Sequence, residues 1–331
     1  MYRAVTTHLK QTTLQKLISL LLLMFFAISC GDTKDYSTDL KPVYADFKNV
    51  WQERNLFGLV KEVEFYKGTY QNGNEEVKPS LVFIEKFTNF GALKEKSNFN
   101  SFGEFFQKDI YEFDGQLLTK NISTDKKGNK NYALIIENDT IKNVTRNKWF
   151  INDSLKTVMD LVYNRKDLLT KKIVYENRDT TITHNDYKFD KANNIVLETQ
   201  TVENTNEPIY TNENLYDENG NLTKTKSKTS WTTFITDIEW KNKRIKKRTE
   251  YTVSADLKTH LDQITEFDDL FNPINSKIYE NSQLNRELMY KYEFDKKGNW
   301  INRKVSMKEH FANSKEFIPI YVESRIIKYW E

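Results

Sequence analysis

The sequence predicts an all-β protein of repeated antiparallel β-hairpins, and three observations carry this prediction. Aromatic residues recur at a near-constant interval, a polar turn motif follows most of them, and apolar and polar residues alternate between the turns. The leading aromatic residues occupy positions 87, 113, 163, 189, 216, 240, 267 and 294, which gives a period of about 26 residues with one double step of 50. A fixed period of this length is typical of repeat architectures.

The turn motif is clearest as YDENGNL at 216–222 and FDKKGNW at 294–300. An Asp after the aromatic residue can accept hydrogen bonds from its own backbone, and a later Gly or Asn adopts the positive φ of a tight turn. Each copy therefore predicts a hairpin turn, and the double step predicts a degenerate copy at 136–141 without its aromatic residue. We expect a structural turn role for Asp114, Asp190, Asp217, Gly220, Asn221, Asp268, Asp295, Gly298 and Asn299.

The segments between the turns alternate with the period of a β-strand. Leu288, Tyr290 and Tyr292 fall on one side of a predicted strand, and Lys291 and Glu293 fall on the other. Because consecutive hairpins usually pair, we expect roughly twenty strands in a curled meander, spiral or barrel-like roll, with aromatic and aliphatic residues on its concave side. A barrel that spans a membrane is less favoured, because charged residues occur on both strand faces.

The N-terminal 29 residues have the pattern of an export signal. Basic residues precede a short apolar run at 17–29, and the only cysteine of the chain, Cys30, follows directly. The segment AISC at 27–30 resembles the lipobox of bacterial lipoproteins, which implies that Cys30 receives lipid. We expect a signal peptide at 1–29, the lipidated cysteine with a flexible tether at 30–55, and a β-hairpin repeat domain at 56–331.

The charge balance argues against nucleic-acid binding, and the cysteine content excludes an internal disulfide. The leader holds three of the 50 basic residues and none of the 47 acidic ones, so the mature chain is formally neutral. A neutral chain lacks the positive field that drives nucleic-acid binding. With a single cysteine the chain forms no internal disulfide, so strand pairing and packing must stabilise the fold.

The motifs at 216–222 and 294–300 resemble the YD repeat of RHS-type proteins, whose repeats build a hollow β-shell. The resemblance covers about residues 87–331. As a whole the chain is similar to uncharacterised exported bacterial lipoproteins that combine a lipobox with YD-like hairpins, and LFGLVKEV at 56–63 resembles their first strand. The resemblance implies a fold and no particular activity.

Signatures of catalysis are missing from the sequence. The histidines outside the leader, His184, His260 and His310, are scattered without metal-ligand spacing. No nucleophile elbow, phosphate-binding loop or dinucleotide loop is present. We therefore expect no enzymatic activity, no cofactor and no metal site. A glycosidase-like carboxylate pair stays open as an alternative, and so does calcium binding by the turn at 217–221.

Tryptophan rings that are exposed can stack on ligands, and the candidates are Trp149, Trp231 and Trp300. We expect a lipid-anchored protein of the cell envelope, at the outer membrane, with a non-catalytic binding or scaffolding role. Its partners are the membrane, through the lipid on Cys30, and a glycan or protein. The alternatives are a glycan- or peptide-binding surface module, a carboxylate-based hydrolase, and an accessory or immunity protein of an RHS-like system.

Overall fold

The computed structural model describes residues 50–331 apart from 72–74, 77, 178, 206, 255 and 311–315. Contacts divide the chain into two units, Met1–Tyr36 and Ser37–Glu331, and every described residue belongs to the second. The expected signal peptide, Cys30 and the tether up to residue 49 therefore lie outside the described residues.

The described elements are one short helix and a series of strands. They are α2 (Val50–Glu53), β1 (Val60–Gln71), β2 (Glu75–Glu76), β3 (Ser80–Phe87), β4 (Leu93–Phe99), β5 (Phe105–Asp114), β6 (Leu117–Asp125), β7 (Lys130–Asp139), β8 (Val144–Ile151), β9 (Ser154–Tyr163), β10 (Leu169–Glu176), β11 (Asp179–Phe189), β12 (Ile195–Val202), β13 (Pro208–Tyr216), β14 (Leu222–Thr229), β15 (Thr233–Lys241), β16 (Arg244–Val253), β17 (Thr259–Phe267), β18 (Pro273–Glu280), β19 (Gln283–Phe294), β20 (Trp300–Glu309) and β21 (Ile318–Tyr329).

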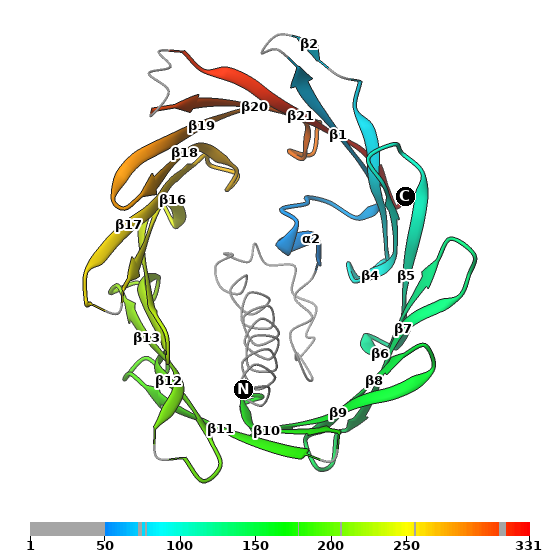
Figure 1. Ribbon diagram of the computed structural model, residues 1–331, viewed down its shortest axis with the longest axis vertical. Coiled ribbons are helices and arrows are strands. Elements are labelled where there is room, and N and C mark those ends of the chain that lie inside the picture. The colour runs from blue at the N-terminus through cyan, green and yellow to red at the C-terminus, as the bar shows by residue number, and fades with distance from the viewer. Residues whose placement is uncertain are drawn as a thin grey trace, which may run out of the picture. The chain divides into compact units, whose positions relative to one another are not determined.

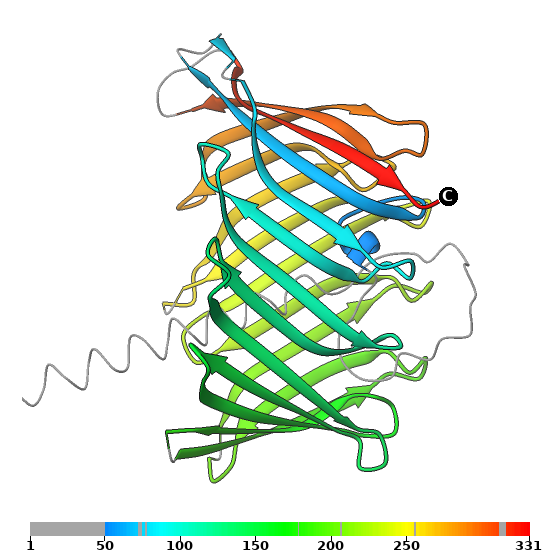
Figure 2. The same cartoon turned by 90° about the vertical axis from the view of Figure 1, so that its right-hand side faces the viewer.

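The strands form one closed antiparallel barrel (Figure 1). From β3 to β21 each strand pairs with the next in sequence, and β1 pairs with β3 on one side and with β21 on the other. Twenty strands thus close the barrel, while the two-residue strand β2 pairs with the last residues of β1. Figure 2 shows the strands inclined to the barrel axis. The expectation of an all-β, barrel-like roll is confirmed, and closure leaves no long strand edge exposed.

The turns at one end of the barrel repeat a common geometry. At Asp217, Oδ1 accepts hydrogen bonds from the amides of Asn219 and Asn221 at 2.9 and 2.8 Å, and Oδ2 accepts one from the Asn221 side chain at 2.9 Å. Gly220 has a φ of 79°, which favours glycine. Equivalent hydrogen bonds to the backbone are accepted by Asp190, Asp268 and Asp295.

The degenerate repeat expected near 136–141 corresponds to the turn between β7 and β8. Oδ1 of Asp139 accepts hydrogen bonds from the amides of Ile141 and Lys142, and Asn143 has a φ of 55°. The period of about 26 residues is therefore the length of one hairpin with its two connections.

Strand register determines which side chains face the interior. Arg54 follows α2, which lies inside the ring (Figure 1), and its Nη2 is 2.9 Å from Oε1 of Glu85 on β3, so Glu85 faces inward. Directly opposed residues of antiparallel strands share a face, as do alternate residues within one strand. These two relations give a consistent set of inward residues around the whole barrel. The set ends at Val63 on β1, which lies opposite Glu85 on β3 and faces the same way. One inward residue from each remaining strand is Lys96, Asp109, Ser123, Leu134, Trp149, Met159, Lys172, Asn185, Gln200, Asn212, Ser227, Thr236, Glu250, Gln263, Ser276, Tyr290, Val305 and Arg325.

The apolar core is small and lies where the barrel closes. Its buried cluster consists of Trp51, Leu56, Val60, Val63 and Phe87, which come from the α2 segment, β1 and β3. Residues 51–56, which precede β1, therefore pack against the seam between the first and last strands.

Candidate functional site: the inner wall of the barrel

The inner wall is rich in aromatic rings and neutral polar side chains. The inward aromatic residues include Phe65, Phe83, Tyr111, Tyr132, Trp149, Tyr187, Tyr210, Phe234, Trp240, Tyr290, Tyr292 and Tyr321. Burial raises the pKa of both Tyr111 and Tyr292 to about 12, so their hydroxyls stay protonated and can donate hydrogen bonds. The wall therefore offers flat rings together with hydrogen-bonding groups.

Amide and hydroxyl groups continue this pattern between the rings. Oγ of Ser227 donates to Oδ1 of Asn212 at 2.8 Å, which links β14 to β13. The Oδ1 atoms of Asn147 and Asn185 are buried, and neither has a hydrogen-bond partner. A buried acceptor without a partner is costly, and a donor on a ligand would remove that cost.

Several inward rings also hold the wall together at one end. Nε1 of Trp240 donates to the carbonyl of Leu222 at 2.8 Å, and the hydroxyl of Tyr187 donates to the carbonyl of Leu169 at 2.8 Å. Each acceptor is the first residue of the strand that follows a repeated turn. These rings thus fix the turn of the preceding hairpin from the inside.

The outer wall carries cross-strand ion pairs. Lys224 and Asp237 are 3.1 Å apart, Lys247 and Glu239 are 2.7 Å apart, and Nε of Arg146 lies 2.6 Å from Oδ1 of Asp160. The register places all of these residues on the face opposite to Glu85. Further outward pairs are Lys86–Glu95, Lys108–Glu95, Lys120–Glu112, Lys148–Glu137, Lys226–Glu213 and Lys328–Glu62.

Trp300 is the centre of a buried cluster on the inner wall. It is 4% exposed, and its ring lies 6.3 Å from the rings of Phe65 and Tyr292. The guanidinium carbons of Arg325 and Arg303 lie 3.5 and 4.8 Å from its centroid. Trp300 is thus a platform for two cations.

The other two tryptophans of the sequence prediction lie elsewhere. Trp149 is half-buried on the inner face of β8, whereas Trp231 is 71% exposed in the loop between β14 and β15. The three rings therefore do not form one exposed platform.

Two of the predicted turn motifs also bind residues 55–57, which precede β1. Asn299 is fully buried, its Oδ1 accepts a hydrogen bond from the amide of Phe57 at 2.6 Å, and its Nδ2 donates to the carbonyl of Phe57 at 2.8 Å. In the preceding motif, Nδ2 of Asn55 donates to Oδ1 of Asn272 at 3.1 Å. Residues 55–57 are therefore fastened to the turn end of the barrel.

The turn carboxylates predict how stability depends on pH. Hydrogen bonds from Asn129, Asn194 and Asn221 lower the pKa values of Asp125, Asp190 and Asp217, respectively. A carboxyl with a lowered folded-state pKa stabilises the fold above its unfolded pKa of about 3.9, and this contribution disappears as pH falls through the folded pKa. We expect the thermal midpoint to drop on acidification from about pH 5 to pH 3.

Differential scanning calorimetry measures this effect, and Asp217→Asn should show a weaker dependence on pH than the wild type. Asp114→Asn is the matched control, because Asp114 precedes a two-residue turn and its carboxylate accepts no turn hydrogen bond from a described residue. A midpoint that stayed constant or rose down to pH 3 would contradict the expectation.

The three most deeply buried acids among the described residues each contact a cation. Glu85 pairs with Arg54 and Lys96, Asp160 pairs with Arg146, and Glu323 pairs with Arg303. The described residues contain no group of three or more His, Cys, Asp or Glu side chains placed to hold a metal ion. The carboxylate-hydrolase alternative stays a prediction.

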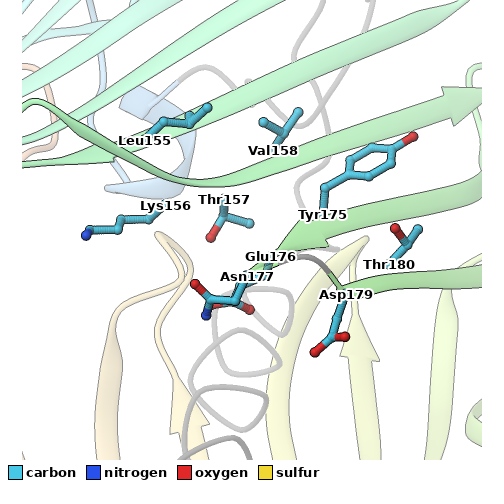
Figure 3. A pocket seen from close by; sticks show the side chains of 9 residues that line it. All are labelled: Leu155, Lys156, Thr157, Val158, Tyr175, Glu176, Asn177, Asp179 and Thr180. Carbon is cyan, nitrogen blue, oxygen red and sulfur yellow. The ribbon is translucent and has the colours of Figure 1, made fainter.

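A small open pocket of about 280 Å³ lies at the other end of the barrel, between the ends of β9, β10 and β11 (Figure 3). Its lining combines Leu155, Val158 and Tyr175 with the polar residues Lys156, Thr157, Glu176, Asn177, Asp179 and Thr180. Its volume is at the lower limit for a small-molecule site.

The likeness of this chain to known proteins is at the level of structure. No protein-family model matches the sequence, and no curated protein matches it. Among solved structures, a porin-like protein from Bacteroides uniformis is 9% identical with a TM-score of 0.36, over 81% of this chain and 96% of that one.

Toxin chains also appear among the similar structures. The Photorhabdus luminescens Tc holotoxin pore has a TM-score of 0.28 at 9% identity over 69% of this chain, and TcdB2-TccC3 has 0.23 at 12% identity over 75%. This chain spans 16% of each toxin chain. These structural likenesses, all with TM-scores below 0.5, are too weak to indicate a function.

Among the described residues, no helix has the length and apolar character needed to cross a membrane.

Proposed function

We propose that this chain is an exported lipoprotein of the cell envelope, held at the membrane through lipid on Cys30, and that its barrel is a non-catalytic binding scaffold. The inner wall is the binding surface, and the ligand is an extended glycan or peptide. The observation that carries the proposal is the difference between the two walls. Cross-strand ion pairs are spread over the outer wall, whereas the inner wall carries many aromatic rings and amide groups beside its own ion pairs, such as Glu85–Lys96 and Arg303–Glu323.

The outer wall favours a barrel surrounded by water. Arg or Lys on the lipid face of a membrane barrel costs about 2–4 kcal/mol at the bilayer midplane. Outward cations such as Lys148, Lys224 and Lys247 are spread along the strands and bridge to acids on neighbouring strands. A lipid anchor supplies membrane attachment without any contact between these strands and lipid.

Along much of its circumference, the inner wall suits a ligand that has apolar faces and hydrogen-bonding edges. Sugar rings and peptide groups both combine apolar faces with hydrogen-bonding edges, and rings such as Tyr132, Trp149 and Tyr210 with amides such as Asn147 and Asn185 match both features. Many similar units side by side suit a ligand that is itself extended.

The test is a binding screen of residues 31–331 against arrays of bacterial glycans and peptides. We expect a hit whose affinity is weakened by Trp149→Ala on the inner wall and unchanged by Lys224→Ala on the outer wall. The proposal fails if no ligand binds, or if the outer-wall variant weakens every hit as much as the inner-wall variant does.

A further inference from the structure

A guanidinium on the inner wall lacks an anionic partner among the described residues. Nη1 of Arg325 is buried and forms no hydrogen bond, and the contact that fixes the side chain is its stacking on Trp300. Burial, assisted by the nearby charge of Arg303, lowers the pKa of Arg325 to about 9. A buried charge without a counter-ion is costly, so the site favours a negative group.

The acids nearest to Arg325 are already shared by other cations. Nε of Arg303 lies 2.6 Å from Oε2 of Glu323, and Nζ of Lys67 lies 3.8 Å from its Oε1. Glu323 therefore has two cationic partners on the inner wall before Arg325 is considered.

Glu85 is shared in the same way. Its Oε1 lies 2.9 Å from Nη2 of Arg54 and 3.3 Å from Nζ of Lys96. Asp109 lies opposite Lys96 and also faces inward. Within this part of the described inner wall, three carboxylates therefore accompany five cations: Arg54, Lys67, Lys96, Arg303 and Arg325.

The outer face of the same strand shows the opposite balance. Lys328 on β21 lies 2.5 Å from Oε1 of Glu62 and 3.0 Å from Oε1 of Glu64. Cations of β21 thus have acidic partners outside and a shortage of them inside, so the excess positive charge belongs to the inner wall.

We propose that the inner wall between β1, β20 and β21 binds an anionic group, a carboxylate or a phosphate, with Arg325 as its principal donor beside Trp300. The planar guanidinium can bind either group through two parallel hydrogen bonds. This inference rests on the proposed role of the inner wall as a binding surface, and it adds that the ligand carries negative charge.

The test is calorimetric titration of the protein with inorganic phosphate and, separately, with succinate, at constant ionic strength. We expect at least one of them to bind, and Arg325→Met to weaken that binding at least about tenfold, as expected for loss of a charged hydrogen-bonding group. Lys328→Met on the outer face is the matched control and should leave the affinity unchanged. Binding of phosphate alone indicates a phosphorylated ligand, and binding of succinate alone indicates a carboxylated one.

Arg325→Lys provides a second variant if Arg325→Met does not fold, because it keeps the charge and removes the planar donor pair. It should fold and bind more weakly than the wild type. The inference is overturned if neither anion binds at millimolar concentration, if chloride gives the same signal, or if Lys328→Met weakens binding as much as the Arg325 variants do. Binding of neutral glycans or peptides without anion binding would overturn this inference and leave the proposed function standing.

Discussion

Phe87→Ala is expected to lower the free energy of unfolding by about 3–5 kcal/mol, the usual cost of removing a large aromatic side chain from a packed core. Phe87 is 2% exposed and belongs to the small apolar cluster at the closing seam, together with Trp51 and Val63. Because that cluster contains few residues, little neighbouring apolar volume is available to fill the cavity.

Phe294→Ala is the matched control for Phe87→Ala. Phe294 occupies the same position before a repeated turn, but it is 39% exposed. Among the described residues its ring stacks on that of Tyr292, with 5.8 Å between the ring centroids. Its loss should cost no more than about 1.5 kcal/mol. Urea unfolding followed by circular dichroism measures both variants, and equal losses would show that the seam cluster is not the core of the fold.

Asn299→Ala is expected to cost about 2–4 kcal/mol, because it leaves the amide and the carbonyl of Phe57 without their partner. The side chain also donates to the hydroxyl of Tyr329 at 2.7 Å, so one buried amide joins the N-terminal segment, a repeated turn and the last strand. The variant should loosen residues 55–57 first, and hydrogen exchange at the amide of Phe57 reports that loosening directly.

Asn221→Ala separates this anchoring role from the turn itself. Asn221 occupies the equivalent turn position, and its described side-chain hydrogen bond stays within the turn, to Asp217. We expect a loss of about 1 kcal/mol or less. If Asn221→Ala and Asn299→Ala were equally destabilised, the contact with Phe57 would contribute nothing.

The sequence was sufficient to predict the hairpins because their signals are local. The Asp at 217 and the Gly at 220 determine a turn within five residues, and alternation such as that of Tyr290, Lys291 and Tyr292 identifies a strand and its two faces. A meander of that many strands had to curl, which predicted a roll but left its closure open.

Closure and the inner-wall cluster depend on long-range register, for which the sequence has no local signal. Val63 lies opposite Ile327 on β21, a pairing that joins the two ends of the domain. The position of Trp300 directly after a turn gives no indication that it is buried under Arg325, because that contact depends on how β20 and β21 are aligned. The reuse of Asn299 to bind Phe57 is equally invisible in the repeat pattern.

The most direct test of the central claim is membrane fractionation of cells that produce the full chain or its Cys30→Ser variant. We expect the wild-type protein to sediment with membranes and to be released only by detergent. We expect Cys30→Ser to appear in the soluble fraction as a folded protein, because placing the charged pairs of the outer wall against lipid would be costly. A Cys30→Ser protein that stayed with the membranes and resisted alkaline extraction would contradict the account, because the barrel itself would then be embedded in the bilayer.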